Sequence, residues 1–415
     1  MSIEKPKLRP VEALPLEGEQ GELVGLRDPF RFAPQTLVIN PATLYLVSLM
    51  DGTRTVAEIQ GEFARLTGAI VPKDKIEGLV NQLDEALFLE SDRFLQHAAQ
   101  VIRDFQQSPV KPMFHQGAYP PDGDTFRAFV GEMLRMAPPP PDPPITQPPR
   151  GYMIPHIDMP RGAEAYAAAF SLIGRFNSAD LYILLGTSHY HAVEDPYTLT
   201  RKDFETPLGN ATTDQEAVQQ LRAALPYDPF SGEFAHRAEH SIEFQAVLLK
   251  GVLGDRPFKI LPVLCGPFDG YFENGKGDPS ADAKVAAFVT GLKAVLRTHP
   301  NACLIASVDF SHVGPKFGDE TPVDGVRLKL LESYDSSMLK SIQQGSAAPF
   351  FSAIAKEKNR THIDAVSPVF TLLSVLDRST GRLLAYRQAF EEPTQSAVSF
   401  ASVAFTSGPT ILIAR

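Results

Sequence analysis

The sequence predicts an α/β protein preceded by a small helical unit, and three observations carry this prediction. The chain has 415 residues, of which 43% are hydrophobic, enough for two or three separate cores. Apolar strand-like runs alternate with helical runs over the last two thirds of the chain. A proline-rich segment, APPPPDPPITQPPR at 137–150, stands before that alternation, and its composition favours an extended connector over a helix or a central strand.

The alternation after the connector defines the elements of the expected sheet. The expected helices occupy residues 163–176, 282–297, 326–342 and 367–376. The expected strands are GYMIP, DLYILLG, FKILPVLCG and ACLIASV, followed by a terminal run of RLLAYRQAF, SAVSFASVAF and TILIAR. Apolar strands separated by helices indicate a largely buried sheet with flanking helices, closed here by antiparallel strands.

Residues 26–95 predict a separate small domain with a winged-helix pattern. Three short helical runs are followed by the extended segment FLES, which we expect to form the wing. The third run, KDKIEGLVNQLDEALF, holds two lysines and four acidic residues, the wrong sign for a DNA phosphate surface. We therefore expect a docking module, with residues 1–25 as a tail and residues 96–111 as a linker to the larger domain at 112–415.

Charge and composition exclude several classes of partner and predict a cytoplasmic protein. The chain has 39 basic and 49 acidic residues, a formal net charge of −10, which argues against binding to nucleic acid or to an anionic membrane. No apolar run approaches the length of a membrane span, and MSIEKPKLRPVEALPLEGEQ lacks the apolar core of a signal peptide. Cys265 and Cys303 each lie in an apolar strand-like run, as buried cysteines of a reducing compartment do.

Histidines gather at the expected carboxyl ends of strands, and this is the main functional signal. His156 follows YMIP, His189 and His191 follow YILLGTS, and His312 follows LIASVDFS. In open α/β sheets ligands bind in the crevice beyond the carboxyl strand ends. Three strands that each deliver a histidine to that edge therefore predict a shared site.

Two further segments carry residues that could join this site. His240, in AEHSIEFQ, opens a helix and is flanked by Glu239 and Glu243. His362 and Asp364, in THIDAVSPVF, stand just ahead of another helix. Imidazole nitrogen and carboxylate oxygen are donors for borderline divalent metals, and two histidines with one carboxylate form the open site of non-haem iron(II) proteins. Zinc can use the same donors. Spacing alone does not select the ligands, so the residues predict a mononuclear metal site with further His and Asp for proton transfer.

The same motifs resemble those of the Memo family, known in prokaryotes as AmmeMemoRadiSam system protein B. YMIPHID resembles the family's APHAGY, ILLGTSHYH its ILGPSHH, AEHSIEFQ its EHSIE-x-Q and SVDFSHVG its SSDFSHYG. HQGAYPPDGDTFRAFVGEML, TPLGNATTD and ILPVLCG resemble three further motifs of the family, in the same order. The resemblance implies a Memo-type α/β sheet similar to that of class III extradiol dioxygenases.

The N-terminal unit resembles the PqqD-like family of small winged-helix domains, which bind peptides beside radical-SAM enzymes. The opening LRDPF, the stretch LMDGTRTVAEI and the ending LDEALFLES carry this resemblance. It implies a peptide ligand for the unit. Together the two resemblances imply radical-SAM and AMMECR-domain proteins as partners.

Carried over by motif, the metal-facing positions of the Memo family fall on His156, His189 and Asp364. This sequence departs from the family pattern twice. Ile157 and Asp158 follow His156 where the family has Gly-Tyr, and Asp364 replaces the cysteine of a Cys-Gly motif. A carboxylate in place of the thiolate restores the two-histidine-one-carboxylate set of the dioxygenases. We therefore expect one divalent metal ion, Fe(II) in preference to Zn or Cu.

The Asp and His of the SSDFSHYG motif fall on Asp309 and His312, and with His240 these are the expected catalytic residues. His312, oriented by Asp309, would move protons, because a histidine titrates near neutral pH. Four residues are expected to surround the ligands without binding the metal: Tyr190, His191, Glu239 and Glu243.

Other roles stay open for several of these residues. Asp364 could be the N-cap of the helix that follows it, and His191 could face solvent. Glu239 and Glu243 suit the first turn of a helix whatever the function. His362 could be a loop residue, and three histidines without a strand-end position are expected at the surface: His97, His236 and His299.

Two functions follow from these observations. The first is a mononuclear non-haem iron oxidoreductase, similar to a dioxygenase, that works with a radical-SAM partner in modifying a peptide or a small molecule. The second is an adaptor that binds metal and peptide without turnover. Metal analysis combined with O₂ consumption would separate them, because only the enzyme consumes O₂ with its substrate.

Overall fold

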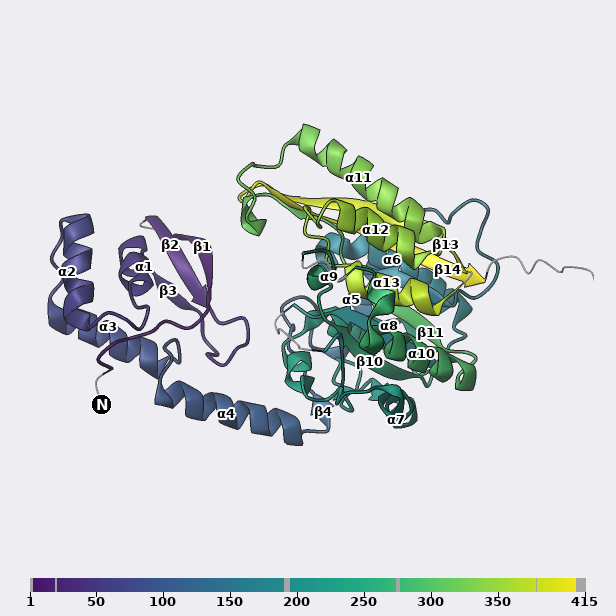
Figure 1. The fold of residues 1–415 in the computed structure, drawn as a ribbon, viewed down its shortest axis with the longest axis horizontal. Helices are drawn as coiled ribbons and strands as arrows, with labels where there is room; N and C mark the ends of the chain where they lie inside the picture. The colour runs from purple at the N-terminus through teal and green to yellow at the C-terminus, as the bar shows by residue number, and fades with distance from the viewer. Residues whose placement is uncertain (1–2, 19–20, 190–194, 274–276, 378, 408–415) are drawn as a thin grey trace, which may run out of the picture. The chain divides into compact units, whose positions relative to one another are not determined.

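The computed structural model describes residues 3–18, 21–189, 195–273, 277–377 and 379–407 (Figure 1). The chain divides into two compact units, Met1–Ser108 and Pro109–Arg415. Each unit buries its own hydrophobic core. In unit 1 that core includes Val47, Ile59 and Phe88, and in unit 2 two large clusters lie on the two faces of one sheet.

Unit 1 combines a three-stranded antiparallel sheet with helices. Its strands, in sheet order, are β1 (Glu12–Gly18), β2 (Gly21–Arg27) and β3 (Leu37–Ile39). Its helices are α1 (Pro41–Ser48), α2 (Val56–Thr67), α3 (Lys73–Glu85) and α4 (Asp92–Gln107). The bounds of α2 follow from its sequence: Thr55 and Glu58 form a capping box at its start, and Gly68, at φ +72°, ends it.

The expected tail and linker at the ends of unit 1 are both wrong. Strand β1 and most of β2 lie within residues 1–25, and Arg9 forms a buried ion pair with Asp28 at 2.8 Å, which ties this segment to the unit. Helix α4 fills most of the expected linker at 96–111, because Ala98 and Phe105 recur at helical spacing and are buried.

The wing expected at FLES also differs. Leu89 in that segment makes only an isolated β-bridge with Leu8, and the hairpin of unit 1 precedes its helices instead of following them. The three helices lie where the sequence predicts them, but the winged-helix assignment of this unit stays a prediction.

Unit 2 is built on one mixed sheet, as the sequence predicts. The order along it is β12-β14-β5-β11-β6-β10-β7, with β13 paired to β14 and β9 paired to β10. Strands β5, β11, β6 and β10 run parallel as neighbours, while β14 pairs antiparallel with β5. The strands are β5 (Gly151–Ile154), β6 (Leu181–Thr187), β7 (Tyr197–Leu199), β9 (Thr212–Thr213), β10 (Lys259–Cys265), β11 (Cys303–Ser307), β12 (His312–Val313), β13 (Ser379–Glu391) and β14 (Ser396–Ser407). A short parallel pair lies apart from this sheet: β4 (Val110–Lys111) and β8 (Asp203–Phe204).

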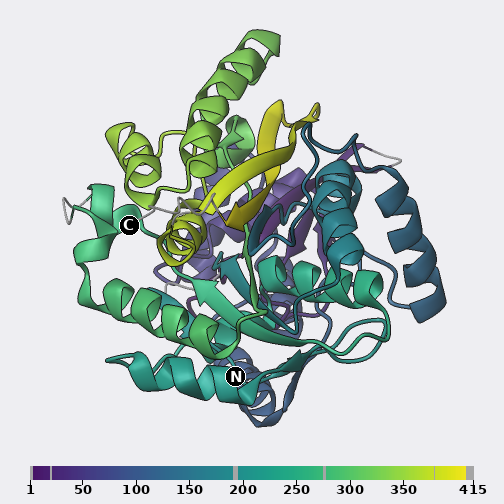
Figure 2. The same cartoon turned by 90° about the vertical axis from the view of Figure 1, so that its right-hand side faces the viewer.

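Helices cover both faces of this sheet (Figure 2). One face packs against α5 (Gly123–Arg135), α6 (Met159–Phe176) and α8 (His240–Leu253). The other packs against α7 (Gln215–Ala224), α10 (Ala283–Thr298), α11 (Gly325–Gln343), α12 (Ala347–Lys356) and α13 (Val366–Val375). A short helix, α9 (Asp269–Glu273), follows β10. The four helices expected from the sequence agree with α6, α10, α11 and α13.

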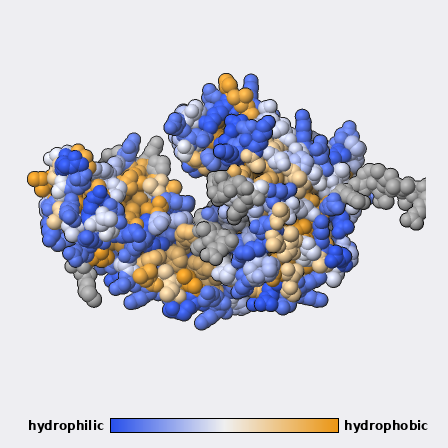
Figure 3. Space-filling view, in the orientation of Figure 1, coloured by the Kyte–Doolittle hydropathy of each residue, from blue (hydrophilic) through white to orange (hydrophobic). Residues whose placement is uncertain are grey.

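The remaining predictions about the chain have clear outcomes. Residues 137–150 contain no helix or strand, as the prolines predict. The expected terminal strand TILIAR is residues 410–415, which lie outside the described residues. Of the helices described, none combines the length and apolar character that a membrane span needs. The face of the molecule in Figure 3 is mostly hydrophilic. Among the exposed apolar side chains are Val326 and Leu330, in the first turns of α11.

Candidate metal centre

The carboxyl ends of three adjacent parallel strands define the candidate site. Strands β5, β11 and β6 are neighbours in that order. His156 follows β5, Asp309 follows β11 and His189 follows β6, each two residues past the end of its strand. Because parallel strands end at the same edge of a sheet, the three side chains gather there, in the position that the sequence predicts.

His156 is almost completely buried and is held in one orientation. Its Nδ1 lies 3.0 Å from the carbonyl oxygen of Ser307, and its backbone N–H donates to Asp309 Oδ1 at 3.1 Å. A carbonyl oxygen only accepts hydrogen bonds, so Nδ1 carries the proton of the neutral ring. The Nε2 lone pair is therefore available to a metal.

His189 is oriented in the same way by Glu239. Glu239 Oε1 lies 2.9 Å from His189 Nδ1, and Oε2 accepts from the backbone N–H of His189 at 2.8 Å. The same carboxylate caps α8 by accepting from the N–H groups of His240 and Ser241. Glu239 thus caps α8 and also orients His189. Because it holds Nδ1, the Nε2 lone pair of His189 stays available to a metal.

Asp364 completes this arrangement. Its Oδ2 lies 2.8 Å from His156 Nε2 and 3.4 Å from His189 Nε2, is buried, and makes no hydrogen bond. Its Oδ1 accepts from the backbone N–H of Asp309 at 2.9 Å. The alternative of an N-cap does not apply, because the cap of α13 is Ala365 and has no side-chain hydrogen bond.

His240 lies beside these residues as a third imidazole. Its ring stacks on that of His189 with centroids 4.7 Å apart, and lies 5.0 Å from that of His156. One donor atom from each of His156, His189 and His240 falls within 4.8 Å of the others, so these three histidines could also hold a metal. Burial lowers the pKa of His240 to about 4, a neighbouring His189 acts in the same direction, and Glu239 opposes them.

The electrostatics of the cluster favour a positive charge. Burial disfavours protonation of His156 and His189, yet nearby carboxylates raise the pKa of both: Asp364 and Asp309 act on His156, and Glu239 and Asp364 on His189. Although burial alone would raise it, the pKa of Asp364 is held well below its ordinary value by the same histidines. The charge between these groups can be a proton or a metal cation.

The donors fit a divalent metal. Two Nε2 atoms and a buried carboxylate oxygen face one another at 2.8 and 3.4 Å, distances that a proton or a metal cation between them would stabilise. Two imidazole nitrogens and one carboxylate oxygen are donors that iron(II) and zinc accept. The sets His156–His189–Asp364 and His156–His189–His240 share two members and differ in the third.

Asp309 and His312 lie close to the cluster, but not as a pair. Asp309 Oδ2 is 3.8 Å from His156 Nε2, and burial raises the pKa of Asp309. His312 opens β12, and its Nδ1 lies 3.1 Å from the carbonyl oxygens of Phe310 and His362. The expectation that Asp309 orients His312 is therefore wrong: backbone carbonyls hold this ring, and Asp309 contacts His156.

Glu243 supports the site without touching its metal-facing histidines. Its buried carboxylate pairs with Lys111 and accepts from Tyr119 Oη at 2.6 Å and from the backbone N–H of His115 at 2.8 Å. His115 in turn places its ring 5.4 Å from that of His240. Glu243 thus fixes the segment that packs against the start of α8.

The other predicted positions have separate outcomes. Tyr190 and His191 lie outside the described residues. His362 lies in a loop at φ +50°, with Nδ1 3.2 Å from the carbonyl oxygen of His312. His236, expected at the surface, is buried, with Nε2 3.2 Å from the carbonyl oxygen of Thr198, because it lies in a tight 3₁₀ turn rather than at an exposed loop tip.

Sequence reasoning missed the polar residues that join α8 to the strand ends. Gln245 Nε2 donates to the carbonyl of Pro155 at 2.9 Å and to Ser307 Oγ at 2.8 Å. Ser307 Oγ donates to the carbonyl of Ser241, and Ser241 Oγ to that of Thr187. The only signal in the sequence is the alternation of polar residues Glu239, Ser241, Glu243 and Gln245 at the start of a helix whose later part is mostly apolar.

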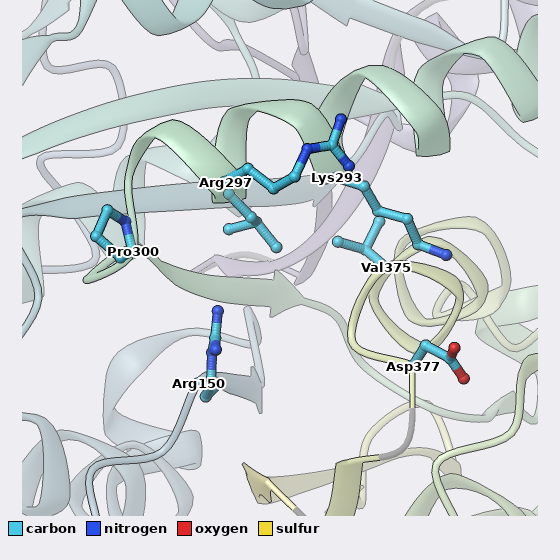
Figure 4. A pocket seen from close by; sticks show the side chains of 7 residues that line it. Arg150, Lys293, Arg297, Pro300, Val375 and Asp377 are labelled. Carbon is cyan, nitrogen blue, oxygen red and sulfur yellow. The ribbon is translucent and has the colours of Figure 1, made fainter.

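A hollow lies away from these histidines, at the amino-terminal ends of β5 and β11 (Figure 4). Its volume is about 500 Å³, and its walls carry Arg150, Lys293, Arg297 and Asp377 beside apolar side chains. Because none of its lining residues is a histidine and it lies at the opposite edge of the sheet, it is not part of the candidate metal centre.

Comparisons with known proteins show the family of the chain. Residues 112–404 match the family described as Memo-like protein. A MEMO1 family protein of Aquifex aeolicus is 31% identical over 405 residues, which cover 97% of this chain and all of that protein. A second MEMO1 family protein, from Thermus thermophilus, is 31% identical over 353 residues, or 84% of this chain and 98% of that protein. The chain therefore belongs to the Memo-like protein family.

Proposed function

We propose that this protein binds one divalent metal ion through His156 Nε2, His189 Nε2 and Asp364 Oδ2, with Fe(II) preferred, and that it catalyses an oxidation there. The observation that carries the proposal is the contact of Asp364 Oδ2 with both Nε2 atoms, at 2.8 and 3.4 Å, without a hydrogen bond. A metal held in this way supplies Lewis-acid chemistry and, as iron, one-electron chemistry with dioxygen.

The other residues of the site orient ligands and move protons in this proposal. The Ser307 carbonyl and the Glu239 carboxylate fix the rings of His156 and His189 through Nδ1. His312 donates through Nδ1 to backbone carbonyls, which leaves its Nε2 as the base. The neutral ring of His240 and the carboxylate of Asp309 lie beside the ligands as further proton carriers.

We also propose a peptide ligand for unit 1 and a partner protein for the reaction. The resemblance of residues 26–95 to PqqD-like domains supports a peptide ligand for unit 1. The Memo-type sequence supports a radical-SAM partner in peptide or small-molecule modification. Both are features of this proposal and rest on those resemblances.

Substitution of Asp364 tests the ligand set, with metal stoichiometry after loading with Fe(II) or Zn(II) as the measurement. Asp364→Asn keeps an Oδ1 that can accept from Asp309 but loses the charge at the second position. We expect both Asp364→Asn and Asp364→Ala to weaken metal binding more than about a hundredfold, beyond the effect of an outer partner. Asp364→Cys should keep a site that prefers softer ions.

Three histidine variants complete the experiment. His240→Ala should retain the metal if Asp364 is the third ligand, and His236→Ala is the matched control, because His236 is buried but hydrogen bonds to Thr198 instead of the cluster. His312→Ala should also retain the metal. Full metal content in Asp364→Asn together with loss in His240→Ala would replace the proposed ligand set by the three histidines.

A further inference from the structure

Asp335, on α11, is a buried carboxylate outside the ligand set. Its side chain is fully buried, and among the described residues no cation forms an ion pair with it. Ser311 Oγ donates to its Oδ1 and Tyr386 Oη to its Oδ2, both at 2.8 Å, and the Ser399 hydroxyl also hydrogen bonds to it. Three hydroxyl groups therefore take the place of a positive partner.

These hydroxyls come from three different segments. Ser311 lies between Asp309 and His312, Tyr386 lies on β13 and Ser399 on β14. Ser311 is also held from its backbone, whose N–H donates to Ser399 Oγ at 3.0 Å. The Asp335 carboxylate thus joins α11 to β13, to β14 and to the segment between Asp309 and His312.

The network continues from Ser311 into the loop that carries Asp364. Ser311 Oγ lies 3.0 Å from Thr361 Oγ1, and the backbone N–H of His312 donates to the carbonyl of Thr361 at 2.7 Å. At the far end of the same two loops, the Asp309 N–H donates to Asp364 Oδ1 at 2.9 Å. Asp335 therefore anchors the pair of loops that together place Asp309, His312 and Asp364.

A buried carboxylate without a cation is costly, because charge is poorly solvated inside a protein. An apolar side chain would pack in α11 without that cost, so the carboxylate needs a reason beyond packing. The hydroxyls supply one: each must donate to an acceptor, and a carboxylate accepts from all three at once. Tyr386 Oη accepts from Gln388 Nε2 at 2.9 Å and gives its own proton to Asp335.

We propose that Asp335 is a positioning residue of the metal centre, which holds the Asp309–His312 loop and the Thr361–Asp364 loop in the register that aims Asp364 at His156. This inference rests on the proposed metal site. It adds a residue that acts through hydroxyl groups and that no motif of the sequence marks.

The test measures Co²⁺ binding, by affinity and by the visible absorption of the bound ion, in the full-length chain. Asp335→Asn keeps one oxygen acceptor but replaces the other by an NH₂ donor, so it can no longer accept from all the surrounding hydroxyls at once. It should lower Co²⁺ affinity by about ten- to a hundredfold, as expected for outer partners of a metal site, with a changed spectrum. Ser311→Ala leaves the carboxylate in place but cuts its link to Thr361, and should change the spectrum in the same sense.

Leu339→Ala is the matched control, since Leu339 lies one turn further along α11, is also buried, and has no part in the hydroxyl network. It should lower the melting temperature while leaving Co²⁺ affinity and spectrum unchanged. If Asp335→Asn binds Co²⁺ as the wild type does, Asp335 has no positioning role. The same conclusion follows if Leu339→Ala weakens Co²⁺ binding in proportion to the stability that it loses. A wild-type chain that binds no Co²⁺ would instead overturn the metal centre itself, and with it this inference.

Discussion

At the scale of single residues, the buried charged side chain of Glu243 lies beside an ion-pair partner and hydrogen-bond donors of the same chain. Glu243 is 1% exposed and has Lys111, also 1% exposed, as its ion-pair partner, with hydrogen bonds from Tyr119 and from two backbone N–H groups. Burial alone would raise the pKa of Glu243, but the Lys111 ammonium and the hydrogen bonds lower it below the ordinary value. The ionised form is therefore the one that the fold stabilises.

Glu243→Gln should destabilise the protein at neutral pH by about 3–5 kcal/mol, because it leaves the Lys111 ammonium buried without a charge partner. A carboxyl with a lowered pKa stabilises the fold above its ordinary pKa of about 4.5 and loses that contribution as pH falls through the folded-state value. The wild type should therefore lose part of its stability below about pH 4.5, and the Gln variant should lack that part.

Denaturant unfolding between pH 3 and 8 measures this difference. Glu391→Gln serves as the control, since the Lys316–Glu391 pair is 44% and 35% exposed and should contribute about 0–1 kcal/mol. Equal effects of the two substitutions would show that the Lys111–Glu243 pair is not buried in the way described.

At the scale of elements, the close approach of α8 to β6 assembles the site. Gly186, near the end of β6, faces the first turn of α8, and a Cβ there would lie 2.5 Å from Ser241 Oγ and 2.6 Å from Ile242 Cγ1. Ser241 Oγ donates to the carbonyl of Thr187 at 2.8 Å. The absence of a side chain at Gly186 therefore lets Glu239, at the cap of α8, reach His189.

Gly186→Ala should displace the start of α8, with a loss of about 1–3 kcal/mol of stability from overpacking and a weaker metal affinity. Gly131→Ala, in α5, is the matched control because nothing lies within 4 Å of its added Cβ, and it should be neutral or slightly stabilising. Thermal unfolding and metal titration of both variants measure these effects. Wild-type metal affinity in Gly186→Ala would show that the distance between α8 and β6 does not control the position of Glu239.

At the scale of the whole molecule, every described residue of the candidate metal centre belongs to unit 2. The histidines, Asp309, Asp364 and Glu239 all lie after Pro109, as do Asp335 and the hydroxyls around it. The Aquifex relative aligns over 97% of the chain, so most of the first 111 residues, which the Memo-like match does not include, also align with that protein. The two units therefore occur together although the site needs only one of them.

A fragment of residues 109–415 should fold and bind metal with the stoichiometry of the full chain, because unit 2 has its own core and all of the donor atoms. Circular dichroism and metal analysis of the fragment test this expectation. The Asp364→Asn form of the fragment is its control and should lose the metal. A folded fragment that binds none would mean that unit 1 contributes to the site.

The sequence by itself determined the α/β class of unit 2, its main helices and strands, and the strand ends that carry His156, His189 and Asp309. Local periodicity and strand-end position are enough for these, since they depend on neighbouring residues. The sequence did not predict the β1–β2 hairpin or the amphipathic helix α4 at the ends of unit 1, because the charged residues of these segments obscured their apolar pattern. Only the tertiary structure decided which acid faces which imidazole: that Asp364 lies on His156 instead of capping α13, that Asp309 contacts His156 instead of His312, and that Asp335 gathers three hydroxyls. These contacts join residues far apart in the chain, and no local pattern encodes the geometry of such a pair.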